Sequence, residues 1–235
     1  MINTTKITRF KENTQGNDYI IGDIHGQWHL VEELLLRLRF DKSKDRLFCC
    51  GDLVDRGQQS HLILEYLAKP WFFSVFGNHE QMLLDSTTSE QDRYFYMREG
   101  GMWFYYEDNT TQKEIIQVVK DLPLLIEIEY GDKLIGICHA EPLFSDWNKT
   151  KELLLYESWD KRLEGIIWGR KRIQVIEMGY DLQEVQGVDL MFCGHSYIGK
   201  EPKIYGNTVF IDTGSGYYED GIPNYPSIIK IEDML

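Results

Sequence analysis

Nine side chains that could bind a metal or act on a ligand follow short apolar runs of the sequence. Three glycine-containing turns carry the sequences GDIHG (22–26), GDLVDRG (51–57) and GNHE (77–80), and two later apolar runs end at single histidines. The nine residues are Asp23, His25, Asp52, Asp55, Arg56, Asn78, His79, His139 and His195. Glycine lets the backbone turn sharply and approach a ligand closely. We therefore expect these side chains to converge on one site.

Six of these residues form a mixed set of oxygen and nitrogen donors, which is typical of a metal site: Asp23, His25, Asp52, Asn78, His139 and His195. Such a set suits Mn, Fe or Zn better than Ca or Mg, which prefer oxygen ligands. One catalytic metal needs fewer ligands, because a coordination position must stay open. The set therefore predicts two divalent metal ions that share a carboxylate, as is usual for phosphoester hydrolysis. His29 and His61 lie in helical stretches and are expected at the surface.

The first half of the chain alternates strand and helix patterns. Apolar runs at 19–21, 47–50 and 71–76 predict buried strands, and helical spacing predicts helices at 28–40, 60–67 and 80–85. This rhythm indicates parallel strands in an α/β fold. The three glycine turns lie at the carboxyl ends of these strands, where functional loops of such sheets gather.

The second half of the chain reads as a mostly antiparallel meander. Runs at 124–130 and 133–138 flank a Gly-Asp turn, and runs at 203–205 and 208–212 flank a Gly-Asn turn, so each pair predicts a hairpin. Further strands are predicted at 188–193 and 227–231. We expect mixed α/β sheets, two of them packed face to face with helices outside, folded as one domain over 1–235.

The composition indicates a globular protein with excess negative charge. The 235 residues carry 25 Lys and Arg against 38 Asp and Glu, a formal net charge of −13. This balance argues against a nucleic-acid partner and against adhesion to an anionic membrane. Residues 1–18 contain no apolar signal-peptide core, and no apolar run reaches the roughly 20 residues that span a bilayer. The four cysteines form no Cys-x-x-Cys pair, so we expect buried thiols and a reducing cytoplasm.

The three glycine motifs together resemble the signature of the PPP-type metallophosphatases. The sequence is most similar to the bacteriophage lambda and bacterial serine/threonine protein phosphatases of that family. Further similar segments are PWFFSVFGNHEQMLLD (70–85), DLPLLIEI (121–128), GICHAE (136–141), IIWGR (166–170), GVDLMFCGHS (187–196) and VFIDTGSG (209–216). The resemblance spans nearly the whole chain and implies the calcineurin-like metallophosphatase fold.

The resemblance also implies how the six donors divide between two metal ions, most favourably Mn²⁺, with Fe and Zn as alternatives. Asp23, His25 and Asp52 would hold the first ion, and Asp52 would bridge to the second. The remaining ligands of the second ion would be Asn78, His139 and His195. A hydroxide between the ions would attack phosphorus in line, because bound metal lowers the pKa of water from about 16 to about 7.

Two further pairs of residues acquire roles from the resemblance. His79, oriented by Asp55, would protonate the leaving alkoxide, a step worth roughly 10²–10⁴-fold in rate. Arg56 and Arg170 would bind the phosphate oxygens, since the planar guanidinium matches a phosphate bidentately. Arg170 rests on the short sequence Trp-Gly-Arg, and Arg172 is the alternative.

The implied activity is hydrolysis of phosphoserine and phosphothreonine in a phosphorylated protein or peptide, with phosphotyrosine and phosphohistidine as further candidates. The alternative is a symmetrically cleaving dinucleoside tetraphosphatase of the same fold. Relatives of that kind tend to carry Asp and Pro at the positions of Glu80 and Gln58, which favours the protein phosphatase. A silent binding module should have lost a metal ligand or His79, and none is missing. We expect Glu141 to point to solvent and the aromatic segment 94–106 to cap the sheet.

Overall fold

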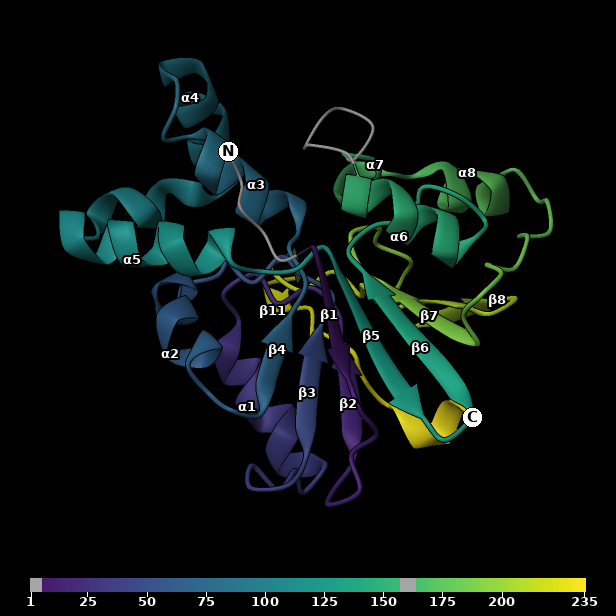
Figure 1. The fold of residues 1–235 in the computed structure, drawn as a ribbon. Coiled ribbons are helices and arrows are strands. Elements are labelled where there is room, and N and C mark those ends of the chain that lie inside the picture. Colours follow the sequence, from purple (N-terminus) through teal and green to yellow (C-terminus); the bar gives the residue numbers. More distant parts are fainter. Residues whose placement is uncertain (1–5, 157–163) are drawn as a thin grey trace.

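The computed structural model describes residues 6–156 and 164–235. One layer is a four-stranded sheet in the order β12-β2-β3-β4. Its strands are β2 (Asp18–Ile21), β3 (Arg46–Cys49), β4 (Phe72–Ser74) and β12 (Ile228–Lys230). β2, β3 and β4 run parallel, and β12 pairs antiparallel with β2. The carboxyl ends of three successive strands therefore meet at one edge of the sheet (Figure 1).

The other layer is a six-stranded sheet in the order β1-β5-β6-β7-β9-β8. Its strands are β1 (Ile7–Phe10), β5 (Leu125–Tyr130), β6 (Lys133–Cys138), β7 (Leu190–Cys193), β8 (Lys203–Tyr205) and β9 (Thr208–Phe210). The hairpins β5–β6 and β8–β9 are confirmed. The expectation of a mostly antiparallel meander is wrong, because β6, β7 and β9 run parallel, as do β1 and β5. A helical crossover between β6 and β7 brings the chain back in the same direction.

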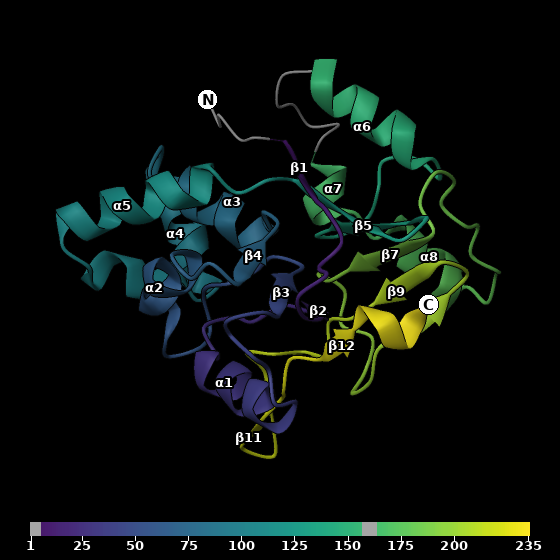
Figure 2. The same ribbon diagram turned by 60° about the horizontal axis from the view of Figure 1, so that its bottom comes forward.

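Helices cover the outer side of each sheet (Figure 1 and Figure 2). Beside the four-stranded sheet lie α1 (Trp28–Arg37), α2 (Ile63–Leu67), α3 (Asn78–Asp85), α4 (Glu90–Arg98) and α5 (Asn109–Lys120). Beside the six-stranded sheet lie α6 (Trp147–Tyr156), α7 (Gly165–Trp168) and α8 (Lys171–Glu177). The remaining elements are the 3₁₀ turns η1 (Ser60–Leu62), η2 (Gly101–Tyr106) and η3 (Ile231–Met234) and the hairpin β10 (Tyr218–Glu219)–β11 (Ile222–Pro223). Within 6–156 and 164–235, no helix combines the length and apolar character needed to cross a membrane.

Local sequence explains where these helices form. Trp28, Val31 and Leu35 recur at helical spacing in α1, and all three side chains are buried. Helix α5 begins after Asp108, whose carboxylate accepts hydrogen bonds from the backbone N–H groups two and three residues further on. Such an N-cap satisfies donors that have no partner within the helix.

Apolar side chains fill both faces of the four-stranded sheet. Ile20 and Phe48 point into the space between the two sheets and pack with Ile137 and Phe192 of the other sheet. Their strand neighbours point the other way and pack under the helices, as expected from the alternation of side chains along a strand. The two sheets therefore pack face to face with helices outside, as predicted, and the four cysteines are buried, unpaired thiols.

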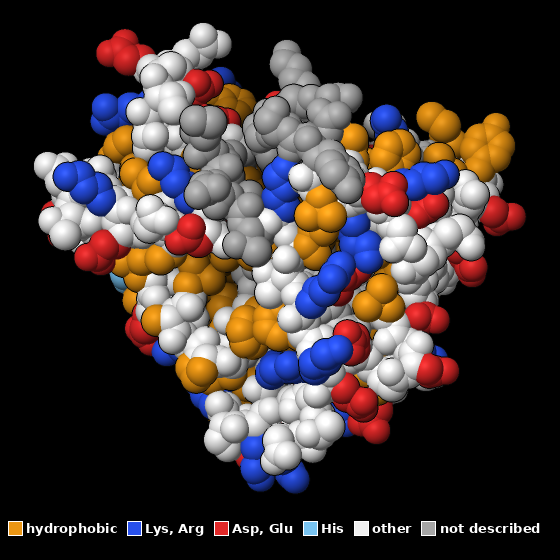
Figure 3. All heavy atoms as spheres, in the orientation of Figure 1, with side chains coloured by type: hydrophobic (Ala, Val, Ile, Leu, Met, Phe, Trp, Pro, Cys, Tyr) orange, Lys and Arg blue, Asp and Glu red, His pale blue; other side chains and the backbone are white. Residues whose placement is uncertain are grey.

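Acidic and basic side chains are interspersed on the face of the molecule shown in Figure 3. Two basic residues in or directly after the first strands form ion pairs with acidic residues of neighbouring strands. Arg46 pairs with Asp18 at 2.6 Å, and Lys11 pairs with Glu129 at 2.6 Å. Basic side chains paired in this way contribute little net positive potential.

Candidate active site

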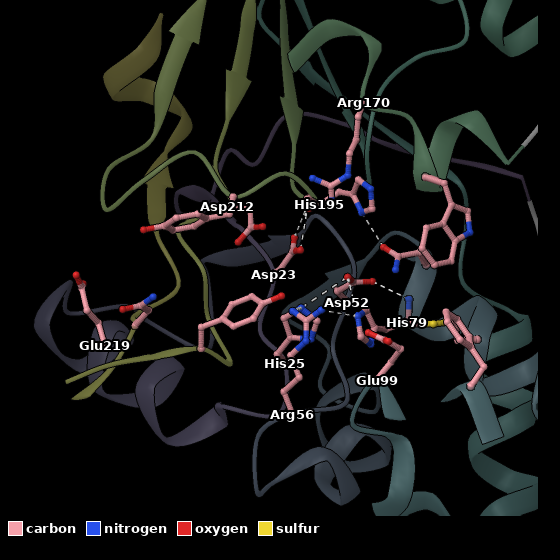
Figure 4. A pocket seen from close by; sticks show the side chains of 17 residues that line it. Asp23, His25, Asp52, Arg56, His79, Glu99, Arg170, His195, Asp212 and Glu219 are labelled. Atoms are coloured by element: carbon pink, nitrogen blue, oxygen red, sulfur yellow. Dashed lines mark hydrogen bonds and ion pairs between the residues drawn. The ribbon is translucent and has the colours of Figure 1, made fainter. Parts of the chain in front are cut away.

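The predicted site residues converge at the edge where strands of both sheets end. The turns after β2 and β3 present Asp23 and Asp52, and α3 begins at Asn78 directly after β4. His139 and His195 follow β6 and β7 of the other sheet. Their side chains surround or adjoin a pocket of about 640 Å³ (Figure 4). The loops of two sheets thus build one site.

Asn78 lies between two histidine rings. Its Oδ1 is 2.8 Å from His139 Nε2 and 2.8 Å from His195 Nδ1, while Asp52 Oδ1 is 3.4 Å from His139 Nε2. His139 Nδ1 lies 2.7 Å from the carbonyl oxygen of Cys50, which can only accept, so Nδ1 carries the proton of the neutral ring. The lone pair of Nε2 therefore faces two oxygen acceptors in a buried space. A cation between these three atoms would stabilise that arrangement.

A second group of donors shares Asp52. His25 donates its Nδ1–H to a backbone carbonyl at 2.9 Å, and its Nε2 lies 3.7 Å from Asp52 Oδ2. Both carboxylate oxygens of Asp23 accept the backbone N–H of His195 at 3.1 Å. A Cβ on Gly194 would lie 2.0 Å from Asp23 Oδ1, so only glycine permits this close approach.

The protonation states of the three histidine donors suit metal binding. Burial lowers the pKa of His25 and of His139, and burial together with His139 lowers the pKa of His195 to about 3. The three rings are therefore neutral at neutral pH, which is the form that ligates a metal. His195 Nε2 is also buried without a hydrogen-bond partner in the described parts of the chain. Converging lone pairs, neutral rings and an unpaired buried nitrogen fit two divalent cations that share Asp52.

His79 has a different environment from these three rings. Its Nδ1–H donates to Asp55 Oδ2 at 2.6 Å. Burial disfavours the charged ring, but the nearby Asp52 and Asp55 outweigh it and raise the pKa of His79. His79 lies close enough to His25 and Asp52 to complete a metal-binding trio. A histidine with a carboxylate partner and a raised pKa can also act as a proton donor.

Arg56 contacts two of the histidines. Its Nη1 lies 2.7 Å from His25 Nε2, its Nη2 lies 3.0 Å from His79 Nε2, and its guanidinium stacks 4.6 Å from the centre of the Tyr217 ring. A guanidinium only donates, so both Nε2 atoms accept in this arrangement. A cation on His25 requires Arg56 to release His25 Nε2, and a proton on His79 Nε2 requires it to release that nitrogen as well. The released N–H groups can then donate to an anion in the pocket.

The two arginines after α7 have different surroundings. Arg170 lines the pocket, and its Nη2 donates to the carbonyl oxygen of His195 at 3.3 Å (Figure 4). Arg172 is buried, and its Nη2 donates to the carbonyl oxygen of Gln183 and to Thr208 Oγ1, each at 2.9 Å. Arg170 therefore faces the site, whereas Arg172 holds α8 against the six-stranded sheet. The alternative of Arg172 as the phosphate ligand is not supported.

Backbone strain concentrates at this site. Seven non-glycine residues of the described chain have positive φ, and five of them belong to the predicted site. These five are His25 (49°), Asp52 (52°), Asp55 (73°), Arg56 (64°) and His195 (64°). Such conformations cost on the order of 1–3 kcal/mol each and persist where the surroundings enforce them, often at functional sites. Four of the five lie in the motifs GDIHG and GDLVDRG, whose glycines are the sequence signal for these tight turns.

Near the site, one residue differs from its sequence-based expectation and two further residues have roles that the sequence does not predict. The expectation that Glu141 points to solvent is wrong, because it is 6% exposed and caps α8 by accepting the N–H groups of Lys171 and Arg172. Glu80 accepts three backbone N–H groups of the loops after β3 and β4, a role that the sequence motif does not indicate. Asp212 follows β9 and is buried on the pocket wall, and no sequence motif marks it as a site residue. Burial raises its pKa to about 6.

The aromatic segment 94–106 both packs and lines the pocket. Tyr96 and Phe104 are buried, as the expectation of a packed cap requires. Phe95 and Glu99 of the same segment line the pocket. His29 and His61 are exposed, as predicted for helix surfaces.

The fold and the donor set are those of a metal-dependent phosphoesterase. Residues 19–199 match the family model of the calcineurin-like phosphoesterases, and the chain belongs to this family. It is 31% identical over 215 residues to serine/threonine-protein phosphatase 2 of Escherichia coli, covering 90% of this chain and 94% of the relative. It is 30% identical over 203 residues to the phosphatase of the same name from Salmonella typhimurium, covering 84% and 87%.

The family likeness extends to enzymes that are named for another substrate. The chain is 34% identical over 125 residues to a symmetrical bis(5′-nucleosyl)-tetraphosphatase of Dechloromonas aromatica, covering 52% of this chain and 40% of the relative. A solved structure described as a putative diadenosine tetraphosphatase superposes with a TM-score of 0.63 at 18% identity, covering 96% of this chain and 97% of that one. A Saccharomyces cerevisiae serine/threonine phosphatase superposes with 0.61 at 17% identity, covering 95% and 82%. At these identities the superpositions show the fold alone.

Proposed function

We propose that this protein is a serine/threonine protein phosphatase, a metal-dependent phosphomonoesterase that acts on phosphorylated proteins or peptides. The observation that carries the proposal is the convergence of three parts on one pocket. These parts are six metal donors, two arginines and the buried His79–Asp55 pair. Each part matches one requirement of phosphomonoester hydrolysis: stabilising charge, orienting the phosphoryl group and protonating the leaving oxygen.

We assign the six donors to two cations. Asp23, His25 and Asp52 would hold one ion, and Asp52 would be shared with a second ion held also by Asn78, His139 and His195. Mn²⁺ is the favoured ion, with Fe and Zn as alternatives, since imidazole and carboxylate ligands suit all three. Bound there, divalent cations lower the pKa of water and offset negative charge on phosphoryl oxygens.

The remaining side chains orient the substrate and deliver a proton. Arg56 and Arg170 would donate hydrogen bonds to the phosphoryl oxygens from two sides of the pocket. His79 would transfer a proton from Nε2 to the serine or threonine oxygen as the P–O bond breaks. Asp55, which accepts the Nδ1–H, keeps the Nε2 side of the ring turned to the pocket and stabilises its positive charge.

The charge of the pocket wall favours a phosphomonoester over a polyphosphate. In the described chain, Arg56 and Arg170 are the only Lys or Arg side chains that line the pocket, while Glu99, Asp212 and Glu219 are acidic lining residues. Two guanidinium groups match one phosphoryl group, and further phosphates would lie against carboxylates. The similarity to the two serine/threonine phosphatases named above covers 84% and 90% of this chain, whereas the similarity to the tetraphosphatase of Dechloromonas aromatica covers 52%. This difference supports the same choice.

A dinucleoside tetraphosphatase is the second candidate function. The rings of Phe95, Trp168, Tyr197 and Tyr217 line the pocket and are partly exposed, and such rings can stack on nucleobases. Relatives and a superposable structure carry names of this activity. The aromatic rim is equally suited to a peptide, so we base the choice between the two functions on the charge of the pocket wall.

A comparison of substrates with one metal tests the proposal. The Mn²⁺-loaded protein should release phosphate from phosphoserine and phosphothreonine peptides with a higher kcat/KM than it cleaves diadenosine tetraphosphate. A phosphotyrosine peptide measures tolerance for an aryl ester. Asp52→Asn, which removes the shared carboxylate, should abolish all of these activities and thereby exclude a contaminating phosphatase. Faster cleavage of the tetraphosphate than of every phosphopeptide would assign the second function instead.

A further inference from the structure

The carboxylate of Asp55 is held by more than His79. Asp55 is fully buried, and its Oδ2 accepts the Nδ1–H of His79 at 2.6 Å. Its Oδ1 accepts two further hydrogen bonds, from Tyr96 Oη at 2.8 Å and from Trp103 Nε1 at 2.7 Å. Three donors from three elements therefore fix both oxygens of one carboxylate. This leaves the carboxylate little freedom to rotate away from His79.

The segment that supplies two of these donors also lies against the strained backbone beside Asp55. Gly100 adopts a left-handed φ of 109°, and a Cβ there would lie 2.6 Å from the backbone nitrogen of Arg56. A Cβ on Gly101 would lie 2.3 Å from the ring of Tyr96. The chain from α4 to η2 is thus packed directly on the Asp55–Arg56 turn, where both residues have positive φ. No other residue type at Gly100 permits this approach without displacing the turn.

The same segment forms part of the pocket wall. Phe95 and Glu99 line the pocket, and Tyr96, between them in the sequence, points to Asp55. Helix α4 therefore places Tyr96 on the carboxylate behind His79 and Phe95 beside the substrate site, and its C-cap residue Glu99 also lines the pocket. The position of this segment is therefore tied both to Asp55 and to the substrate site.

We propose that Tyr96 and Trp103 are positioning residues for the proton donor of the reaction. Their hydrogen bonds hold Asp55 in the orientation that aims His79 at the leaving oxygen. This inference rests on the proposed function, in which His79 protonates the leaving alkoxide. Neither residue lines the pocket, so each acts through Asp55 rather than by touching the substrate.

A positioning role predicts a specific kinetic signature. Loss of one donor removes one of the three hydrogen bonds that fix the buried carboxylate, which is then less restrained against rotation away from His79. The resulting misalignment of His79 slows only a step that needs its proton. Serine is a poor leaving group and needs that proton, whereas nitrophenolate leaves without one. Binding of the phosphoryl group to the arginines is unaffected.

The experiment compares Tyr96→Phe, Trp103→Phe and the double variant, each supplied with Mn²⁺. We expect kcat for a phosphoserine peptide to fall by about 5- to 50-fold in each single variant and further in the double variant. For p-nitrophenyl phosphate we expect kcat to fall by less than about 3-fold. KM for both substrates and the bound Mn²⁺ per chain should match the parent. Tyr105→Phe is the matched control, since Tyr105 lies in the same segment and its hydroxyl donates to the Ser86 carbonyl instead.

A second set of variants in a His79→Asn background separates this inference from the proposed function. There, Tyr96→Phe and Trp103→Phe should cause no further loss on the phosphoserine peptide, because the residue they position is gone. Equal losses on both substrates, or full losses in the His79→Asn background, would overturn the positioning role while leaving the phosphatase intact. If His79→Asn itself slows both substrates equally, the assignment of His79 as proton donor fails. If one of the two single variants does not fold, the other still tests the positioning role, both in the parent and in the His79→Asn background.

Discussion

Replacing Arg170 with alanine should slow phosphate release without destabilising the fold. Replacing Arg172 with alanine should destabilise the fold without slowing phosphate release. Arg170 lines the pocket and makes one long hydrogen bond, at 3.3 Å, to a backbone carbonyl. Arg172 is buried and donates to two acceptors at 2.9 Å. The pair lies two residues apart and has the same chemistry, so each variant is the control for the other.

The magnitudes follow from these contacts. A donor that bonds to the developing charge of the phosphoryl group is worth roughly 1.5–4 kcal/mol, so Arg170→Ala should lower kcat/KM by about 10–10³-fold. Arg172→Ala removes two hydrogen bonds from a buried charged group and leaves their acceptors unmet, which should cost about 3 kcal/mol of unfolding free energy. For a chain of this length that corresponds to a fall in Tm of roughly 6–12 °C.

The assay measures kcat and KM with a phosphoserine peptide at fixed Mn²⁺, alongside thermal unfolding of the same samples. Arg170→Lys should recover only part of the activity, because a point charge cannot form the bidentate contact. Inorganic phosphate should inhibit Arg170→Ala less than the parent. Parental kinetics in Arg170→Ala, combined with a catalytic loss and an unchanged Tm in Arg172→Ala, would refute this assignment of the two arginines.

Three further predictions concern metal, proton and charge. Chelation should abolish activity and Mn²⁺ should restore it better than Ca²⁺, measured as phosphate release after dialysis. His79→Asn should slow a phosphoserine peptide by roughly 10²-fold or more but an aryl phosphate much less, with metal content unchanged. Burial opposes the charge of Glu127, but Lys151, Trp147 and Arg9 hold its pKa below 4.5. The charged Glu127 therefore contributes its full stabilisation above pH 4.5, and this stabilisation is lost as the pH falls through the depressed pKa. In urea unfolding, Glu127→Gln should have a free energy of unfolding about 1.5–3 kcal/mol below that of the parent at pH 7, and this difference should shrink in acid.

The strand ends of the site were predictable because local chemistry marks them. A glycine-bounded turn after an apolar run signals a strand that stops at a sheet edge, and three such turns in succession implied parallel strands. The motifs therefore predict Asp23, Asp52 and Asn78 just beyond the ends of three strands, and these residues follow β2, β3 and β4 in the structure. The same reasoning predicted the hairpin of β5 and β6 from its Gly-Asp turn.

What the sequence left open depends on contacts between distant segments. The parallel run of β6, β7 and β9 follows from the crossover, which has no signal in the periodicity of the strands. Glu141 becomes a helix cap because the loop after β6 lies against the start of α8, where Glu141 meets Lys171 across 30 residues of the chain. Tyr96 meets Asp55 across 41 residues, and composition alone cannot separate such a ring from ordinary packing.

The two-metal site is tested most directly by a titration of the metal-free protein with Mn²⁺, in which bound metal per chain and phosphate release from a phosphoserine peptide are measured on the same samples. We expect activity to be absent without metal and to reach its maximum only as the second equivalent binds. We also expect Asp52→Asn, which removes the shared ligand, to bind fewer than two ions and to stay inactive. Full activity in demonstrably metal-free protein, or saturation at one bound ion, would contradict the two-metal site.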